Sequence, residues 1–112
     1  MNYTEALANF IQLVTERTQR HFAKNFDLLI PPKYEVIHNR KYDKVISISD
    51  GGHGQRSVYC WIDPKTGDIM KGSWKAIEDK RSRGNIFNAD PLEGTNIYGV
   101  DYLNMSNEAY KE

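Results

Sequence analysis

Cysteine, histidine and long apolar segments are scarce in this sequence, and each scarcity excludes a class of protein. The 112-residue chain has one cysteine, Cys60, so it cannot form an internal disulfide, and a reduced compartment is expected. No apolar run approaches the roughly 18–20 residues that span a bilayer. Charged side chains also interrupt the first 22 residues, where a secretory signal would lie. These features predict a cytoplasmic protein without a membrane partner.

Motifs that specify an enzymatic reaction are also missing. The sequence has no Gly-x-Ser-x-Gly elbow, no His-Glu-x-x-His helix and no closely spaced carboxylates suited to metal-dependent phosphodiester chemistry. The three histidines, His21, His38 and His53, lie far apart and lack metal-ligand spacing. Asp50 with His53 is the one conceivable acid–base pair, and no other residue supports it. The sequence therefore predicts no catalytic residue, no metal site and no cofactor.

The length and the first apolar pattern predict a single α+β domain that spans residues 1–112. A chain of this size can bury roughly two-thirds of its unfolded surface. Residues 3–23 place apolar side chains at three- and four-residue steps, as an amphipathic helix does. Asn2 and Glu5 have the spacing of a capping box. Such a helix needs a surface to pack on, and a sheet is the expected one.

From Tyr34 the apolar period changes to two, which predicts an antiparallel sheet over residues 34–74. Four strands are expected, at residues 34–39, 44–49, 57–62 and 68–74. The sequence Asp-Pro-Lys-Thr-Gly at residues 63–67 is a strong turn signal, because proline presets the turn and Gly67 accepts a left-handed backbone. The expected fold is an N-terminal helix packed on a four-stranded antiparallel meander with an irregular C-terminal arm.

The periodic signal fades after Trp74. Residues 75–84 are a basic segment that can form one or two helical turns before Gly84. Residues 85–112 are a loop-rich acidic arm that is expected to fray from about residue 106. Four of its residues are expected to pin it to the core: Tyr98, Val100, Tyr102 and Leu103. Residues 71–83 carry a net charge of +3 and residues 84–112 carry −4. This asymmetry indicates either an anion site beside a repelling edge or two solvated faces that neutralise each other.

The loop between the second and third expected strands is one candidate anion site. Its three glycines let backbone amides turn toward a phosphate or carboxylate, and His53, Arg56 and Ser57 can add donors. It lacks the lysine and helix of a Walker motif and the helix of a dinucleotide fingerprint. The loop is therefore either a ligand contact through Gly52, His53, Gly54 and Arg56 or a flexible hairpin connection.

The third and fourth expected strands supply the second candidate. We expect Val58, Cys60 and Ile62 to face the helix, which makes Cys60 an inert core thiol. Strand alternation then points Tyr59 and Trp61 to the opposite, open face. Open aromatic rings flanked by cations commonly hold single-stranded nucleic acid, because bases stack on the rings and cations neutralise phosphate. The expected binding residues are Tyr59, Trp61, Lys71, Trp74, Lys75, Arg81 and Arg83.

Other uses of that open face remain. It can serve as a homodimer interface, since exposed tryptophan and tyrosine also anchor protein contacts. The C-terminal arm can instead fold over it and complete the core. The reverse orientation, with Tyr59 and Trp61 in the core, is also open. The partners under consideration are therefore a nucleic acid or nucleotide, a host protein and a second copy of the chain.

One segment resembles a known group of proteins. Residues 66–76 read TGDIMKGSWKA, and residues 83–87 read RGNIF. This pairing is similar to small proteins of unassigned function in tailed bacteriophages, and the match covers about a quarter of the chain. Ile77 stands where these proteins often have proline. The resemblance brings no catalytic residues. It implies a phage or prophage setting in a bacterial cell, and an accessory factor that binds nucleic acid or nucleotides or blocks a host or defence protein.

Overall fold

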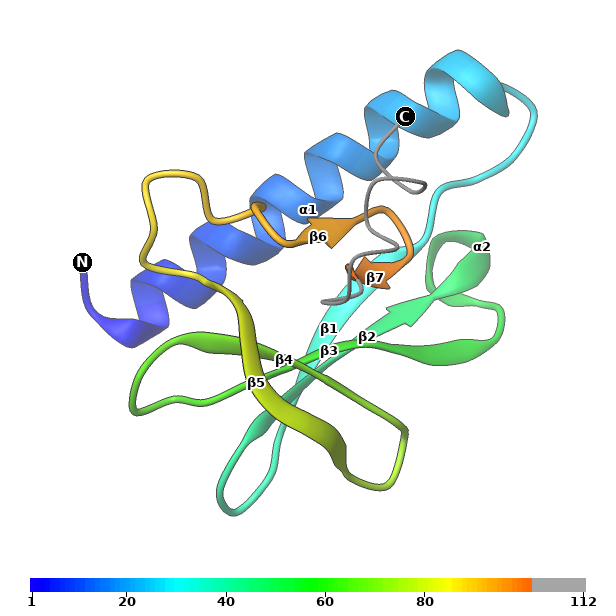
Figure 1. The fold of residues 1–112 in the computed structure, drawn as a ribbon. Coiled ribbons are helices and arrows are strands. Elements are labelled where there is room, and N and C mark those ends of the chain that lie inside the picture. The colour runs from blue at the N-terminus through cyan, green and yellow to red at the C-terminus, as the bar shows by residue number, and fades with distance from the viewer. Residues whose placement is uncertain (102–112) are drawn as a thin grey trace.

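The computed structural model describes residues 1–101, which form an N-terminal helix, a five-stranded antiparallel sheet and a short hairpin (Figure 1). The predicted α+β class is confirmed, although the sheet has five strands rather than four. The helix is α1 (Tyr3–Asn25), and the sheet runs in the order β1 (Lys33–His38), β2 (Asp43–Ile48), β3 (Arg56–Ile62), β4 (Asp68–Gly72) and β5 (Ile77–Asn85). No helix among residues 1–101 is long and apolar enough to cross a membrane.

The capping box predicted at the start of α1 is present. The Asn2 side chain accepts a hydrogen bond from the Glu5 amide at 2.9 Å, and the Glu5 carboxylate accepts one from the Asn2 amide at 3.0 Å. Both bonds satisfy amides that have no partner within the helix. Ala6, Phe10 and Val14 are fully buried, so α1 lies with its apolar stripe on one face of the sheet (Figure 1).

The predicted turn between the third and fourth strands is confirmed. The Gly67 amide donates to the Asp63 carbonyl at 2.7 Å, and the Asp63 side chain accepts from the Lys65 amide at 2.8 Å. Gly67 has a φ of 81°, which favours glycine because other residues rarely adopt this left-handed conformation. The turn joins β3 to β4 and places the two strands antiparallel.

The prediction of helical turns within residues 75–84 is wrong, because this segment forms β5. In the ladder with β4, Ile77 lies opposite Gly72 and Asp79 opposite Lys71. Pairing satisfies backbone groups along the edge of β4 that a helical segment would leave unpaired. Gly84 does not end a helix. It permits a close approach, since an added Cβ would lie 2.4 Å from the Glu93 carbonyl oxygen.

An irregularity in β3 overturns part of the predicted alternation. Val45 pairs with Cys60 and Ile46 pairs with Val58, so Tyr59 is an extra residue without a partner on β2. Such a bulge puts two consecutive side chains on the same side of a strand. Tyr59 and Cys60 accordingly share the core beneath α1, while Val58, which was expected there, lies outside it and is half-buried.

The described part of the C-terminal arm packs on the helix side of the sheet. It forms a short hairpin of β6 (Thr95–Asn96) and β7 (Gly99–Val100), seen between α1 and the sheet in Figure 1. Val100 packs against the core as expected, whereas Tyr98 is 82% exposed, so its predicted anchoring role is wrong. The predictions for Tyr102, Leu103 and the fraying from residue 106 concern positions outside the described residues.

Candidate anion and nucleic-acid site

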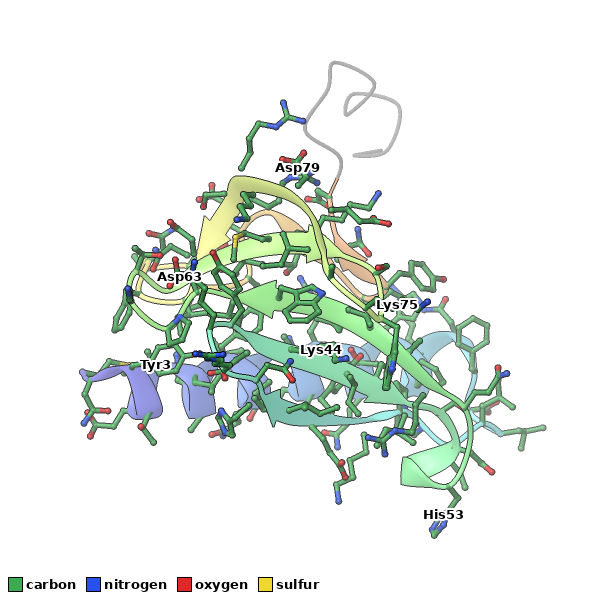
Figure 2. All side chains as sticks on the ribbon, turned by 90° about the horizontal axis from the view of Figure 1, so that it is seen from below. Tyr3, Lys44, His53, Asp63, Lys75 and Asp79 are labelled. Atoms are coloured by element: carbon green, nitrogen blue, oxygen red, sulfur yellow. The ribbon has the colours of Figure 1, made fainter. Side chains whose placement is uncertain are left out.

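The sheet has a covered face and an open face. α1 and the β6–β7 hairpin lie over the covered face (Figure 1), whereas Figure 2 views the sheet from the opposite side, with Lys44 and Lys75 on it. Trp61 lies across from Lys44 on β2 and from Met70 on β4. Trp61 therefore lies on the open face as predicted, but it is only 5% exposed. Its burial means that it cannot be the exposed stacking platform that the sequence indicated.

Trp61 and Lys44 hold the β4–β5 turn against the open face. The Trp61 indole Nε1 donates to the Ser73 carbonyl at 3.0 Å, and the Lys44 Nζ donates to the Trp74 carbonyl at 2.8 Å. The Trp61 ring also lies directly over Gly72, where an added Cβ would be 2.4 Å from it. Hydrogen bonds to both carbonyls fix the turn, so these two side chains shape the site.

Trp74 is the more accessible tryptophan. Its exposed fraction is 45%, and the Lys44 ammonium lies 4.0 Å from its ring centroid. The same ammonium lies 5.3 Å from the Trp61 ring. These distances allow cation–π attraction, which is stronger when the cation is desolvated, as Lys44 is at 7% exposure. Trp74 is therefore held in place and still offers part of its ring to a ligand.

A cavity of about 340 Å³ lies between the β1–β2 turn and the β4–β5 turn, and we call it the basic cavity. Its lining includes Tyr42 and Trp61. The Lys41 and Lys80 ammonium groups each lie 5.8 Å from the Tyr42 ring centroid. No carboxylate lines the cavity among the described residues, whereas four cationic side chains do: Arg40, Lys41, Lys75 and Lys80. A cavity of this composition attracts anions.

The basic cavity contains only part of the predicted site. Trp61 and Lys75 line it. Trp74 precedes Lys75 in the chain, and its ring faces the same Lys44 ammonium as the Trp61 ring. Sequence reasoning missed four of the lining residues: Arg40, Lys41, Tyr42 and Lys80. The first three lie between the expected strands at residues 34–39 and 44–49, where the sequence indicates only a connecting turn. The positive charges of Arg40 and Lys41, taken together with the net charge of +3 of residues 71–83, would have indicated a larger basic surface.

The predicted phosphate contacts on β5 are engaged within the protein. The Arg81 Nη2 lies 2.7 Å from the Asp79 carboxylate, and the Arg83 Nη2 lies 2.8 Å from it. Arg83 also donates to the Asp101 carbonyl at 2.7 Å, and its side chain is 5% exposed. Hydrogen bonds from Arg81, then from Arg83, hold the pKa of Asp79 well below its ordinary range. Arg83 is therefore a buried structural residue, and its predicted surface role is wrong.

Lys71 is also separated from the basic cavity. It lines a different cavity, of about 380 Å³, together with Asn96 and Val100 of the β6–β7 hairpin. In the ladder it lies opposite Asp79. The prediction that Lys71 and Lys75 form one phosphate-binding surface is therefore wrong.

The glycine-rich loop does not offer its amides to an anion. It contains the short element α2 (Ser49–Gly52), in which Asp50 and Gly51 have positive φ values, and the amides of Gly51, His53 and Gly54 bond within the protein. The Gly51 amide donates to the Pro31 carbonyl at 3.1 Å, and the Gly54 amide to the Ser49 carbonyl at 2.8 Å. The predicted amide cradle is thus wrong at these positions.

The remaining groups of that loop lie on the surface. The His53 amide donates to the Asp50 carbonyl at 3.2 Å, while the side chains of His53 and Arg56 are exposed. Gly52 has a φ of 105°, so the turn itself requires glycine there. Figure 2 shows His53 at the outer end of the loop, pointing away from the sheet. The loop is a hairpin connection separate from the basic cavity.

Tyr59, expected on the open face, belongs to a hydrogen-bond network on the covered face. The Arg17 Nη2 donates to the Tyr59 hydroxyl at 2.7 Å, and that hydroxyl donates to the Asn96 carbonyl at 2.6 Å. Arg17 also donates to the Thr95 hydroxyl at 3.0 Å. Burial raises the pKa of Tyr59 to about 12, against a lowering effect of Arg17. This network ties α1 to β3 and to the β6–β7 hairpin.

A histidine–carboxylate pair occurs where the sequence did not indicate one. His38 Nδ1 lies 2.8 Å from one oxygen of Asp43, and the Tyr3 hydroxyl donates to the other at 2.6 Å. Burial, then the Asp43 carboxylate, raises the pKa of Tyr3. The adjoining cavity, of about 810 Å³, has no serine, cysteine or lysine in its described lining. The cluster joins the start of α1 to the β1–β2 hairpin.

Two other features bear on chemistry. Cys60 is fully buried, as predicted, and burial raises the pKa of its thiol. A buried, protonated thiol is a poor nucleophile. Within residues 1–101 no three histidine, cysteine or acidic side chains group closely enough to hold a metal ion.

The fold and the basic cavity define a class: a small α+β domain whose open sheet face carries a cavity lined by cationic and aromatic side chains. The chain belongs to DUF7717, a family of unknown function, whose model matches residues 1–102. No curated protein and no solved structure matches the chain.

Proposed function

We propose that this protein is a small, non-catalytic accessory protein that binds nucleic acid or a nucleotide-like anion in the basic cavity. The observation that carries the proposal is the set of four cationic side chains that line one cavity without a carboxylate among the described residues. Its volume of about 340 Å³ lies at the lower end of the roughly 300–1,000 Å³ of ligand pockets. It has room for one nucleotide unit of a strand.

The chemistry of binding follows from two kinds of side chain. Lysine and arginine neutralise phosphate and release its condensed counterions, which makes affinity depend on salt. The half-exposed Trp74 ring faces the same Lys44 ammonium as Trp61, a lining residue of the cavity, and it can offer its accessible part to a base. Stacking contributes roughly 1–3 kcal/mol per base. Because Lys44 and Trp61 already fix the β4–β5 turn, little ordering is required when the ligand arrives.

The test is a tryptophan-fluorescence titration with single-stranded DNA and RNA oligonucleotides at two salt concentrations. We expect quenching that weakens as salt rises, since each neutralised phosphate of a single strand adds about −0.7 to the slope of log affinity against log salt. The double variant Lys75→Gln/Lys80→Gln should bind weakly and with a shallower slope. Its matched control is Lys24→Gln/Lys65→Gln, which removes two exposed charges outside the cavity.

Two results would refute this proposal. One is the absence of any fluorescence change at low salt with either nucleic acid. The other is an equal loss of affinity in the cavity variant and in the control variant, because this would indicate a general charge effect and not a site. Circular dichroism of each variant establishes that the fold is intact.

A second candidate function is favoured by an apolar surface at the other end of the molecule. A cavity of about 430 Å³ lies between the C-terminal half of α1, the β2–β3 loop and the β6–β7 turn. Five large apolar side chains on or beside it are exposed: Phe26, Leu28, Leu29, Ile30 and Tyr98. Leu28 reaches 93% exposure. Exposed apolar clusters of this kind mark protein contacts. We propose a homodimer through this surface as the alternative function, in which the dimer masks a host or defence protein.

Light scattering over a range of protein concentrations tests the homodimer. We expect the mass to rise toward that of two chains, and Leu29→Glu, which puts a charge into the cavity lining, to keep the protein monomeric. The control Lys65→Glu puts the same acidic residue on a distant turn and should still associate. A constant monomer mass at tens of micromolar, on the order of a weak interface's affinity, would contradict the dimer.

The cellular setting comes from the sequence resemblance. Residues 66–76 and 83–87 are similar to small tailed-phage proteins, so we place either function in the cytoplasm of a bacterial host. An accessory role there requires binding and no catalytic group, which fits both candidates.

A further inference from the structure

Several cations outside the basic cavity form ion pairs with carboxylates. On β5, next to Lys80, the acidic Asp79 engages Arg81 at 2.7 Å and Arg83 at 2.8 Å. On the edge strand β1, Lys33 pairs with Glu35 at 3.6 Å. Lys33, Arg81 and Arg83 thus already have carboxylate partners. A long strand bound through its internal phosphates would need charge spread along its path.

Two of the four cations of the basic cavity lie against the same aromatic ring. Lys41 comes from the β1–β2 turn and Lys80 from β5, yet both ammonium groups lie 5.8 Å from the Tyr42 ring centroid. Arg40 and Lys75 line the same cavity from the two turns that bound it. Four positive charges around about 340 Å³ exceed what one phosphodiester, with a single negative charge, can neutralise.

We propose that the basic cavity recognises a phosphomonoester attached to a nucleoside, and not an internal phosphodiester. This inference rests on the proposed function of the same cavity. A terminal phosphate carries about −1.5 to −2 charges at pH 7 and three acceptor oxygens, so it can engage several ammonium groups at once. Tyr42 of the cavity lining provides aromatic surface for the attached nucleoside, and the half-exposed Trp74, next to Lys75 in the chain, adds to it. The ligand is either the phosphorylated end of a strand or a free nucleotide.

The experiment compares ligands that differ by one phosphate. The same short single-stranded oligonucleotide is titrated with a 5′-phosphate, with a 3′-phosphate and with hydroxyls at both ends, at fixed salt. We expect at least one phosphorylated strand to bind about tenfold tighter or more than the hydroxyl strand, the effect of one or two charge-assisted hydrogen bonds. Lys41→Gln and Lys80→Gln should each remove that difference, and Lys65→Gln should keep it.

Competition distinguishes the two sources of the ligand. A nucleoside 5′-monophosphate that displaces the labelled strand at similar concentration identifies a free nucleotide as sufficient. A nucleotide that competes poorly, while the phosphorylated strand still binds tightly, identifies a strand end. Inorganic phosphate that competes as well as either would overturn the nucleoside part of the proposal. All variants replace exposed lysines, so the fold should tolerate them.

The two proposals fail in different ways. If phosphorylated and hydroxyl strands bind equally and both lose affinity in Lys80→Gln, the preference for a phosphomonoester is wrong and nucleic-acid binding at this cavity stands. If none of the strands, nucleotides or phosphate binds, both proposals are wrong.

Discussion

The two faces of the sheet use the same kinds of side chain for different purposes. On the covered face, the guanidinium of Arg17 donates hydrogen bonds to neutral partners, among them the Tyr59 hydroxyl and the Asn96 carbonyl. On the open face, Lys41 and Lys80 approach one tyrosine ring in a cavity without a carboxylate. A cation beneath a helix becomes part of the framework, because buried donors must be satisfied. A cation that lines an open cavity without a carboxylate has a charge that no neighbouring lining residue neutralises.

Aromatic and basic residues in the sequence are therefore not enough to locate a site. Tyr59 and Trp61 are both buried, one on each face, and each donates a hydrogen bond to a backbone carbonyl. What separates the faces is whether another element covers them. The following predictions test that separation by comparing a change on one face with a matched change on the other.

The largest expected effect is on the covered face, in Arg17→Met. This change removes all of the guanidinium hydrogen bonds to Tyr59, Thr95 and Asn96, so the free energy of unfolding should fall by about 3 kcal/mol. The matched change on the open face, Lys80→Met, should alter it by about 0.5 kcal/mol or less. Urea denaturation followed by circular dichroism measures both.

The reverse pattern should hold for binding. Lys80→Met should weaken binding of the phosphorylated strand, while Arg17→Met, measured well below its unfolding midpoint, should leave it unchanged because Arg17 lies on the other side of the sheet. Equal stability losses in the two variants would contradict the division between the faces.

A smaller loss is expected from Lys44→Met, which replaces a buried lysine of the open face. The variant keeps an apolar stem but loses the bond to the Trp74 carbonyl and the cation–π contacts, so we expect a loss of about 1–2 kcal/mol. The emission of Trp74 should change, because the ammonium now lies 4.0 Å from its ring. Unaltered emission together with unaltered stability would show that Lys44 does not hold the turn.

Tyr59→Phe isolates a single hydroxyl of the covered face. We expect a loss of about 1 kcal/mol, since the ring remains and only its hydrogen bonds to Arg17 and Asn96 are lost. The pKa of Tyr59 is raised to about 12 by burial, above the ordinary value of about 10. Its contribution to stability is therefore complete below about pH 10 and is lost as the pH rises toward about 12.

Tyrosinate absorbance measures this titration as the difference between wild-type protein and Tyr59→Phe. One late-titrating group should disappear in the variant. If the difference spectrum shows a group that titrates near pH 10, the Tyr59 hydroxyl is solvated and the covered network is not formed.

The elements with local signals could be predicted from the sequence. The capping box at Asn2, the periodicity of α1 and the left-handed Gly67 each depend on a few neighbouring residues, and each is present. The fifth strand could not be predicted, because β5 is charged along most of its length and is held by pairing with β4. The bulge at Tyr59 is also non-local, since it depends on the register with β2. That single extra residue moved Tyr59 to the opposite face.

The candidate site was predictable only in outline. The sequence placed Trp61, Trp74 and Lys75 near one another, and they are near one another here. It could not show that Arg83 is buried against Asp79, because both residues belong to β5, a strand that the sequence does not predict. Nor could it show that the β1–β2 turn reaches Lys80, since this contact requires the curvature of the whole sheet.

The smallest expected effect is that of Arg81→Gln, which tests the border between the engaged and the available cations. Arg81 is exposed, and its guanidinium bonds the Asp79 carboxylate, so stability at pH 7 should change little. Ligand affinity should fall less than in Lys80→Gln, because the Arg81 charge is already paired.

The pKa of Asp79 should rise toward its ordinary value of about 4, since Arg81 is the largest cause of its lowering. In wild-type protein the stabilisation from Asp79 is complete above about pH 4 and is lost as the pH falls through its lowered pKa, so the variant should lose it at higher pH. Carboxyl NMR over pH 2–6 measures the shift, and an affinity loss equal to that of Lys80→Gln would place Arg81 in the binding site after all.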